Sequence, residues 1–192
     1  YRSIFRWGDP KFFKYPKESL YTLMKETFKM TDDDFKEYSD DIGFDPVDLS
    51  DHPVQLAPEH IEALKKIVGE RNVSTTDYDR LSVAYGFTAY DILRLRHKRV
   101  DSVPDVVLYP ETSEQVEQIV AYSTEHHIPL YVYGGGSSVT RGVEPTKGGI
   151  SLDMRRNFNK VISFNEIDQT ITVQAGMSGP DLEKTLQSAP EL

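Results

Sequence analysis

A run of three glycines is the part of this 192-residue sequence best suited to holding a ligand. The glycines stand in a ten-residue stretch that reads Leu130, Tyr131, Val132, Tyr133, Gly134, Gly135, Gly136, Ser137, Ser138, Val139. Its apolar and aromatic first half predicts a buried strand. Consecutive residues without a Cβ let the backbone approach a ligand closely, and their N–H groups can point into one concavity that suits a phosphate or diphosphate. Ser137 and Ser138 add two hydroxyl donors.

The alternative is a glycine-rich turn between strands that holds no ligand, since such loops are common. The flanking residues exclude two large classes of nucleotide site. A dinucleotide fingerprint needs a third glycine where Val139 stands, followed by a helix that the residues around Pro145 cannot form. A Walker loop needs Ser or Thr after its lysine, whereas Lys147 is followed by Gly148.

The composition describes a polar, globular chain with an excess of acid. It has 31 acidic and 22 basic residues, a formal net charge of −9, and 38% hydrophobic residues. This excess repels nucleic acid and anionic membrane surfaces, so we expect neither as the main partner. The absence of cysteine excludes disulfides, thiol catalysis and a cysteinyl flavin link. No apolar run approaches transmembrane length, and both ends of the chain indicate a piece of a longer protein.

The first hundred residues are predicted to be mainly helical. Apolar stripes, caps and terminal glycines indicate helices that begin near residues 19, 31, 58, 74 and 88. The sequence pattern changes from helical to mixed near residue 103. A strand at 106–109, a helix at 112–127 and a strand at 130–133 are predicted to form a parallel crossover unit. A strand at 150–153, a hairpin around 165–168 and a helix at 179–187 follow. The second half is therefore predicted to be α+β with a mixed sheet.

Residues with catalytic or metal-binding chemistry are scattered. The five histidines are His52, His60, His97, His126 and His127. None has the spacing of a catalytic triad, so we predict no catalytic residue in this chain. Adjacent histidines at a helix end face different ways, and the acidic run Asp32–Asp34 lacks the order of a calcium loop, so we predict no metal site.

Local basic spots can bind an anion despite the acidic total. The two candidates are Arg94–Arg99 and Arg155–Arg156. Arg141, which follows the glycines, either neutralises a phosphate or is a solvated loop residue.

An ordered series of segments resembles the flavin-binding half-domain of the vanillyl-alcohol oxidase / p-cresol methylhydroxylase (PCMH) superfamily. The segments that carry the resemblance are Pro104–Pro110, Gln115–Val116, Ile119–Val120, Ile128–Ser138, Ile150–Asp153 and Val173–Leu182. The resemblance extends over residues 103–187 and is specific, because it rests on a series of elements in order and not on one loop.

In that superfamily the glycine-rich turn lies against the diphosphate of FAD. The resemblance therefore makes seven residues candidates for FAD contact: Val132, Tyr133, Gly134, Gly135, Gly136, Ser137 and Ser138. Many members carry a flavin-linking histidine just after the glycines, where this chain has Ser137. Since the chain has no cysteine either, we expect this half to bind FAD non-covalently.

The helical region is similar to the alkyldihydroxyacetonephosphate synthase branch of the superfamily. The residues that carry this likeness are Trp7–Phe13, Asp79–Leu81, Tyr85–Gly86, Asp91, Leu95–Arg96 and Val103–Asp105. The likeness implies a transferase of ether-lipid synthesis, which exchanges the acyl chain of acyl-dihydroxyacetone phosphate for a long-chain alcohol without net redox change. The alternatives are an FAD-linked oxidoreductase of 2-hydroxy acids such as D-lactate or glycolate, and a non-catalytic nucleotide-binding fragment.

These predictions combine into one α+β architecture. An N-terminal mainly helical region (1–100) precedes the first half of a PCMH-type FAD-binding domain with a mixed sheet (101–192). We expect the domain and the catalytic residues to continue beyond Leu192, so that the fragment alone is inactive. The expected partners are FAD and a lipid-like or 2-hydroxy-acid small molecule, and a homodimer is compatible with the sequence. The expected location is the cytoplasm, or the peroxisome in a eukaryote.

Overall fold

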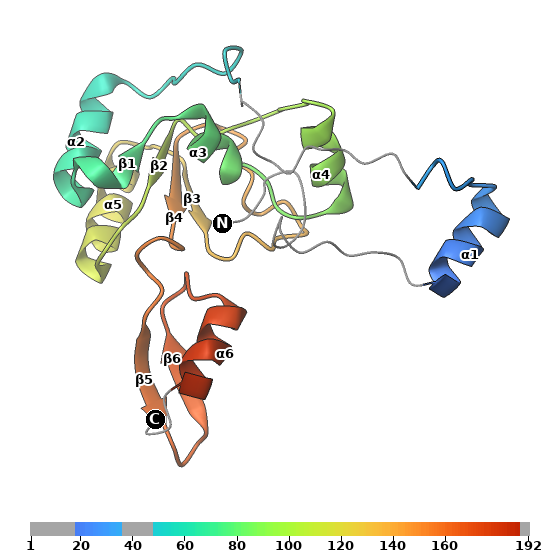
Figure 1. The fold of residues 1–192 in the computed structure, drawn as a ribbon. Helices are drawn as coiled ribbons and strands as arrows, with labels where there is room; N and C mark the ends of the chain where they lie inside the picture. Colours follow the sequence, from blue (N-terminus) through green and yellow to red (C-terminus); the bar gives the residue numbers. More distant parts are fainter. Residues whose placement is uncertain (1–17, 36–47, 189–192) are drawn as a thin grey trace. The chain divides into compact units, whose positions relative to one another are not determined.

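The computed structural model describes residues 18–35 and 48–188 and divides the chain into two compact units, Tyr1–Pro46 and Val47–Leu192 (Figure 1). In the first unit, helix α1 (Glu18–Phe28) confirms the helix predicted from residue 19. The helix predicted from residue 31 is wrong over residues 32–35, which form a turn. Its remainder and the segment Trp7–Phe13 lie outside the described residues.

The described part of the second unit begins with three α-helices, one 3₁₀ helix and a short strand. They are α2 (Pro58–Val68), the 3₁₀ helix η1 (Glu70–Asn72), β1 (Val73–Ser74), α3 (Asp77–Ser82) and α4 (Ala89–Arg96). Helix α4 confirms the helix predicted from residue 88, and Thr88 caps it in a capping box with Asp91. The helix predicted from near residue 74 begins later, at Asp77 with Thr76 as its cap, because Ser74 belongs to a strand that the sequence did not indicate.

The main sheet has four strands in the order β1-β2-β4-β3. Strands β2 (Val106–Leu108) and β3 (Leu130–Tyr133) both pair in parallel with β4 (Ile150–Asp153), while β1 pairs antiparallel with β2. Helix α5 (Ser113–Glu125) connects β2 to β3. The predicted α+β fold with a mixed sheet is therefore confirmed, with β4 inserted between the two strands of the crossover.

The position of each strand in the sheet decides its burial. All four residues of the central strand β4 are buried. Strand β3 lies at the edge, so of its residues only Tyr133 is buried, and Val132 is 56% exposed. The strand at 130–133 is present, but the prediction that it is buried is wrong except at Tyr133. An edge strand has a neighbouring strand on one side only, so more of it is exposed.

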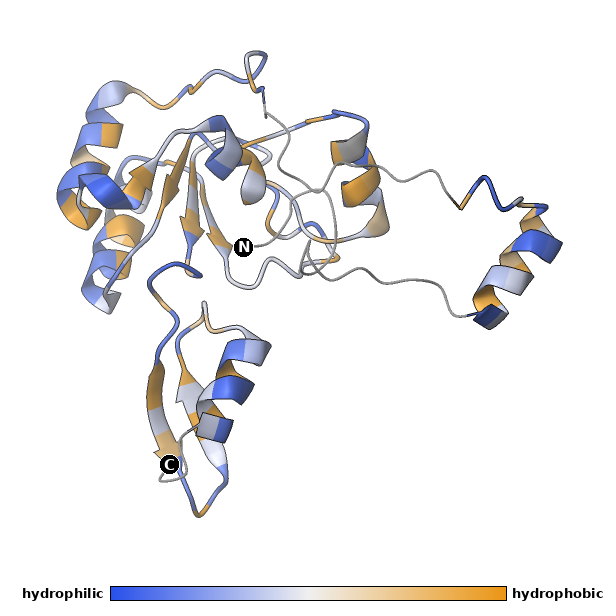
Figure 2. Cartoon of the chain, in the orientation of Figure 1, coloured by the Kyte–Doolittle hydropathy of each residue, from blue (hydrophilic) through white to orange (hydrophobic). Residues whose placement is uncertain are grey.

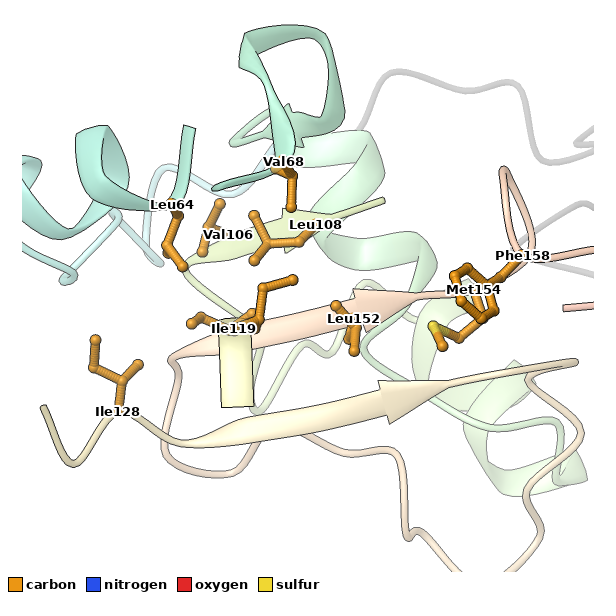
Figure 3. Close-up of a cluster of buried hydrophobic side chains, with 10 residues drawn as sticks. Leu64, Val68, Val106, Leu108, Ile119, Ile128, Leu152, Met154 and Phe158 are labelled. Atoms are coloured by element: carbon orange, nitrogen blue, oxygen red, sulfur yellow. The ribbon is translucent and has the colours of Figure 1, made fainter. Parts of the chain in front are cut away.

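Side chains of β2 pack on both faces of the sheet, as the period of two requires. On one face, Val106 and Leu108 meet α2 and α5, and Figure 3 shows Leu64 and Val68 of α2 directed toward them. The other face has a smaller cluster made of Val83, Val107, Tyr109 and Tyr133. The second cluster matters for function because Tyr133 ends β3 and Tyr109 directly follows β2, at the same edge of the sheet as the glycine loop.

The predicted hairpin is confirmed but forms a separate two-stranded sheet. It consists of β5 (Val161–Asn165) and β6 (Thr170–Val173), and helix α6 (Gly179–Ser188) follows it. Figure 2 shows hydrophobic residues along both strands, and Ile162 is 63% exposed. Within residues 18–35 and 48–188, no helix combines the length and the apolar composition needed to cross a membrane.

Candidate functional site

Three loops begin at the carboxyl edge of the main sheet. The glycine loop (Gly134–Ser138) follows β3, the turn 154–157 follows β4, and Tyr109 follows β2. The N–H of Met154 donates to the carbonyl of Tyr133 at 3.0 Å, so the first two loops start side by side. Ligands of open sheets with parallel strands bind at this edge, beyond the carboxyl ends of the strands.

Gly136 turns the glycine loop directly over the ring of Tyr133. Its φ is +65°, a conformation that favours glycine. A Cβ on Gly136 would overlap the hydroxyl of Tyr133 and lie 2.5 Å from its Cε1. Because Tyr133 is 1% exposed and cannot move aside, only glycine fits this position.

The other two glycines have different surroundings. A Cβ on Gly134 would lie 3.3 Å from the carbonyl oxygen of Ala175, which is a tight contact. Gly135 is exposed, and the nearest atom to a Cβ there is Ser137 Oγ at 4.0 Å. The loop therefore has packed glycines on both sides of an exposed residue that has room for a Cβ. This geometry fits a group that must come close to the backbone, as a diphosphate does.

Two guanidinium groups lie at the same edge, in the predicted basic spot Arg155–Arg156. Arg155 forms a bidentate ion pair with the buried carboxylate of Asp153, with N–O distances of 2.6 and 2.9 Å, and its guanidinium lies 4.6 Å from the centre of the Tyr133 ring. Arg156 is exposed and stacks on Tyr109 at 4.8 Å. The sequence indicated the arginines but not their tyrosine partners, because each pair joins two different strands.

Charge and burial set the protonation of these groups. Burial lowers the pKa of Arg155, but the hydrogen bonds to Asp153 and the charge of that carboxylate outweigh it, so the pKa is raised. Burial raises the pKa of the Tyr109 phenol, and the charges of Asp79 and Asp153 act in the same direction. At neutral pH Arg155 is therefore cationic and the phenol of Tyr109 is neutral.

Arg141 is an exposed loop residue whose charge is already paired with a carboxylate. It is 55% exposed, yet its Nε and Nη2 donate to the two carboxylate oxygens of Glu144 at 2.9 and 2.6 Å. These hydrogen bonds raise the pKa of Arg141. Arg94, from the other predicted basic spot, is buried and donates to Glu144 as well, at 2.8 Å. Arg94 is thus buried and ion-paired within the protein, and it is not a surface anion site.

Two histidines that lie far apart in the sequence come together on the helices. His60 of α2 hydrogen-bonds through Nδ1 to the hydroxyl of Tyr122 at 2.8 Å, and the His126 ring lies 4.3 Å from the Tyr122 ring. Periodicity did not reveal this cluster, since it depends on the packing of α2 against α5. Across the described part of the chain, no three His, Cys, Asp or Glu side chains gather in a way that could hold a metal ion.

A cavity of 260 Å³ lies at the other end of the strands, beside the residues that precede β2 and β4. Its lining includes His52, Arg80, Asp105 and Lys147. The carboxylate of Asp105 accepts the N–H groups of Gln55 and Gly149, each at 2.6 Å. Asp105, the residue that precedes β2, thus connects the segment before α2 with the start of β4.

Comparison with known proteins agrees with this geometry. The profile of a family described as FAD binding domain matches residues 104–190. Alkyldihydroxyacetonephosphate synthase of Dictyostelium discoideum is 30% identical over 137 residues, which cover 70% of this chain and 22% of the relative. D-lactate dehydrogenase [cytochrome] 1, mitochondrial, of Saccharomyces cerevisiae is 28% identical over 146 residues, which cover 75% of this chain and 24% of the relative.

Solved structures give the same result. A structure of alkyldihydroxyacetonephosphate synthase matches with a TM-score of 0.67 and 28% identity, over 74% of this chain and 26% of that one. The fold alone is shared with p-cresol methylhydroxylase, at a TM-score of 0.52 and 18% identity, over 71% of this chain and 26% of that one. The chain thus spans about a quarter of the length of the proteins it matches. Residues 104–190, which contain the glycine loop, its strand and the hairpin, match the FAD binding domain family, and the chain shares the PCMH-type fold of these solved structures.

Proposed function

We propose that Val132–Ser138 cradle the diphosphate of FAD and that this chain binds the cofactor non-covalently. The observation that carries the proposal is the exposed, side-chain-free position of Gly135, between two packed glycines at the carboxyl edge of the sheet and within the region matched by the FAD binding domain family. Gly136 and the Tyr133 ring give the loop its shape. Non-covalent binding is supported by Ser137, which has no nucleophilic ring nitrogen, and by the absence of cysteine.

Arg156 is the cation best suited to balance the charge of the diphosphate. It is exposed and held by stacking on Tyr109, whereas the charge of Arg155 is already matched by Asp153. FAD, when bound, supplies the redox-active and electrophilic ring system, and the residues of this chain hold its phosphate end.

We propose that the whole protein is an FAD-dependent enzyme that exchanges an acyl for an alkyl group on acyl-dihydroxyacetone phosphate. The support is the similarity to alkyldihydroxyacetonephosphate synthases in both sequence and structure. The functional division at residue 100, the lipid-like substrate, the homodimer and a cytoplasmic or peroxisomal location are parts of the same proposal.

A second candidate function is the FAD-linked oxidation of a 2-hydroxy acid. It is favoured by the 28% identity to the yeast protein named D-lactate dehydrogenase. One assay on the purified full-length protein separates the two. Alkyl exchange on acyl-dihydroxyacetone phosphate without an electron acceptor supports the first function. Oxidation of D-lactate or glycolate that requires an acceptor supports the second, and a flavin-free protein inactive in both assays contradicts both.

A further inference from the structure

The glycine loop is held by a segment that precedes the FAD binding domain in the sequence. Gly86 lies against the last residue of the loop, Ser138. A Cβ on Gly86 would overlap the carbonyl oxygen of Ser138 and lie 2.9 Å from its carbonyl carbon. The N–H of Phe87 donates to the same carbonyl at 3.0 Å. The two backbones therefore touch at a place where no side chain fits between them.

A buried chain of ion pairs makes a second attachment. Arg94 of α4 is 3% exposed and donates to the equally buried Glu144 at 2.8 Å. It also donates to Asp101 at 3.0 Å, and its guanidinium stacks on Tyr85 at 4.3 Å. The exposed Arg141 is the last member of this series of ion pairs, through its bidentate pair with Glu144. Because a buried ion without its partner is strongly unfavourable, α4 and the segment after the glycine loop are held together.

The two attachments enclose a compact loop. Ser138 is the residue held by the first attachment, and Glu144 is the residue held by the second. Between them the chain turns back toward Ser138, since a Cβ on Gly142 would lie 3.9 Å from Ser138 Oγ. Arg141 has a φ of +63°, which is uncommon for a residue other than glycine. Such a conformation persists where the surroundings determine it, and here Glu144 holds the side chain.

We propose that Gly86 and Arg94 are positioning residues for FAD: they hold the glycine loop in its binding shape before the cofactor arrives. The inference rests on the proposed role of the loop as the diphosphate cradle. A loop that is already ordered binds more tightly than one that must be ordered during binding. FAD affinity therefore depends on residues 86–94, which lie outside the matched domain of residues 104–190.

The test measures FAD binding and the protection of the glycine loop from amide hydrogen exchange, both in the full-length protein. Gly86→Ala displaces the backbone of Ser138, and Glu144→Gln weakens the attachment to Arg94 while keeping the side chain's size. Gly179→Ala is the matched control, because a Cβ there has no neighbour within 4 Å. The dissociation constant of FAD is measured on the apoprotein, together with amide hydrogen exchange at residues 134–142 and in β4.

We expect both variants to weaken FAD binding at least ten-fold and to speed exchange in the loop but not in β4, with no change in the control. Unchanged affinity in either folded variant overturns the inference. Failure of both variants to fold also overturns it, because the residues would then serve the fold as a whole. A wild-type protein that does not bind FAD contradicts the proposed function instead, so the two failures are distinguishable.

Discussion

The ring of Tyr133 fills the space that a side chain on Gly136 would need. The hydroxyl of Tyr133 lies where a Cβ of Gly136 would be, and Arg155 stacks on the same ring at 4.6 Å. The last residue of β3, the turn of the glycine loop and a cation from the end of β4 thus form one continuous contact. This contact couples the shape of the candidate cradle to the buried core of the sheet.

Gly136→Ala should lower the free energy of unfolding by about 2–5 kcal/mol, from the positive φ and the overlap with Tyr133 together. Denaturant unfolding of the purified protein measures this change. Gly135→Ala is the matched control, since it has room for a Cβ and no positive φ, and it should be neutral or stabilise by up to about 1 kcal/mol. Equal losses in the two variants would contradict the described packing of the loop.

Gly135→Asp should weaken FAD binding at least ten-fold while the protein stays folded. The new carboxylate would stand in the open space beside the loop, where it repels the diphosphate. Flavin absorbance per polypeptide after purification and titration of the apoprotein report the effect. Gly135→Asn has nearly the same size without the charge and should retain most of the affinity. If both variants bind FAD like the wild type, the loop is not the diphosphate site.

The flavin should leave the protein on denaturation, because the loop has no histidine or cysteine to form a covalent link. Acid precipitation of the purified full-length holoprotein should leave all flavin absorbance in the supernatant. A denaturing gel examined under ultraviolet light provides an independent check. Yellow, fluorescent polypeptide after either treatment would show a covalent bond and refute the prediction.

Stability should fall at alkaline pH through Tyr109. Its pKa is raised in the folded protein by burial, so the unfolded chain loses the phenolic proton first, near pH 10. Between that pH and the higher folded pKa, the unfolded state binds fewer protons, and stability decreases by up to about 1.4 kcal/mol per pH unit.

Tyr109→Phe should remove this component of the pH dependence. Urea unfolding at pH 9, 10 and 11 compares the variant with the wild type. Tyr90→Phe, at an exposed tyrosine, is the control and should keep the wild-type slope. The same slope in Tyr109→Phe and wild type would show that another group controls alkaline unfolding.

Local patterns predicted most of the fold. Thr88 marked the start of α4. The alternation of helix and strand signals placed α5 and the strands β2 to β6, because these elements depend on neighbours in the sequence. The strand β1 was missed, since two residues are too few to show a period. The exposure of Val132 was missed as well, because it follows from the place of β3 at the sheet edge.

The sequence by itself determined the three glycines, the serine that follows them and the order of elements that resembles a flavin-binding half-domain. Only the tertiary structure decided what surrounds the loop: Tyr133 beneath Gly136, Arg156 on Tyr109, and Gly86 against Ser138. The physical reason is that these contacts join segments far apart in the chain. They are set by the pairing order of the strands and by burial on both faces of the sheet, which no local pattern encodes.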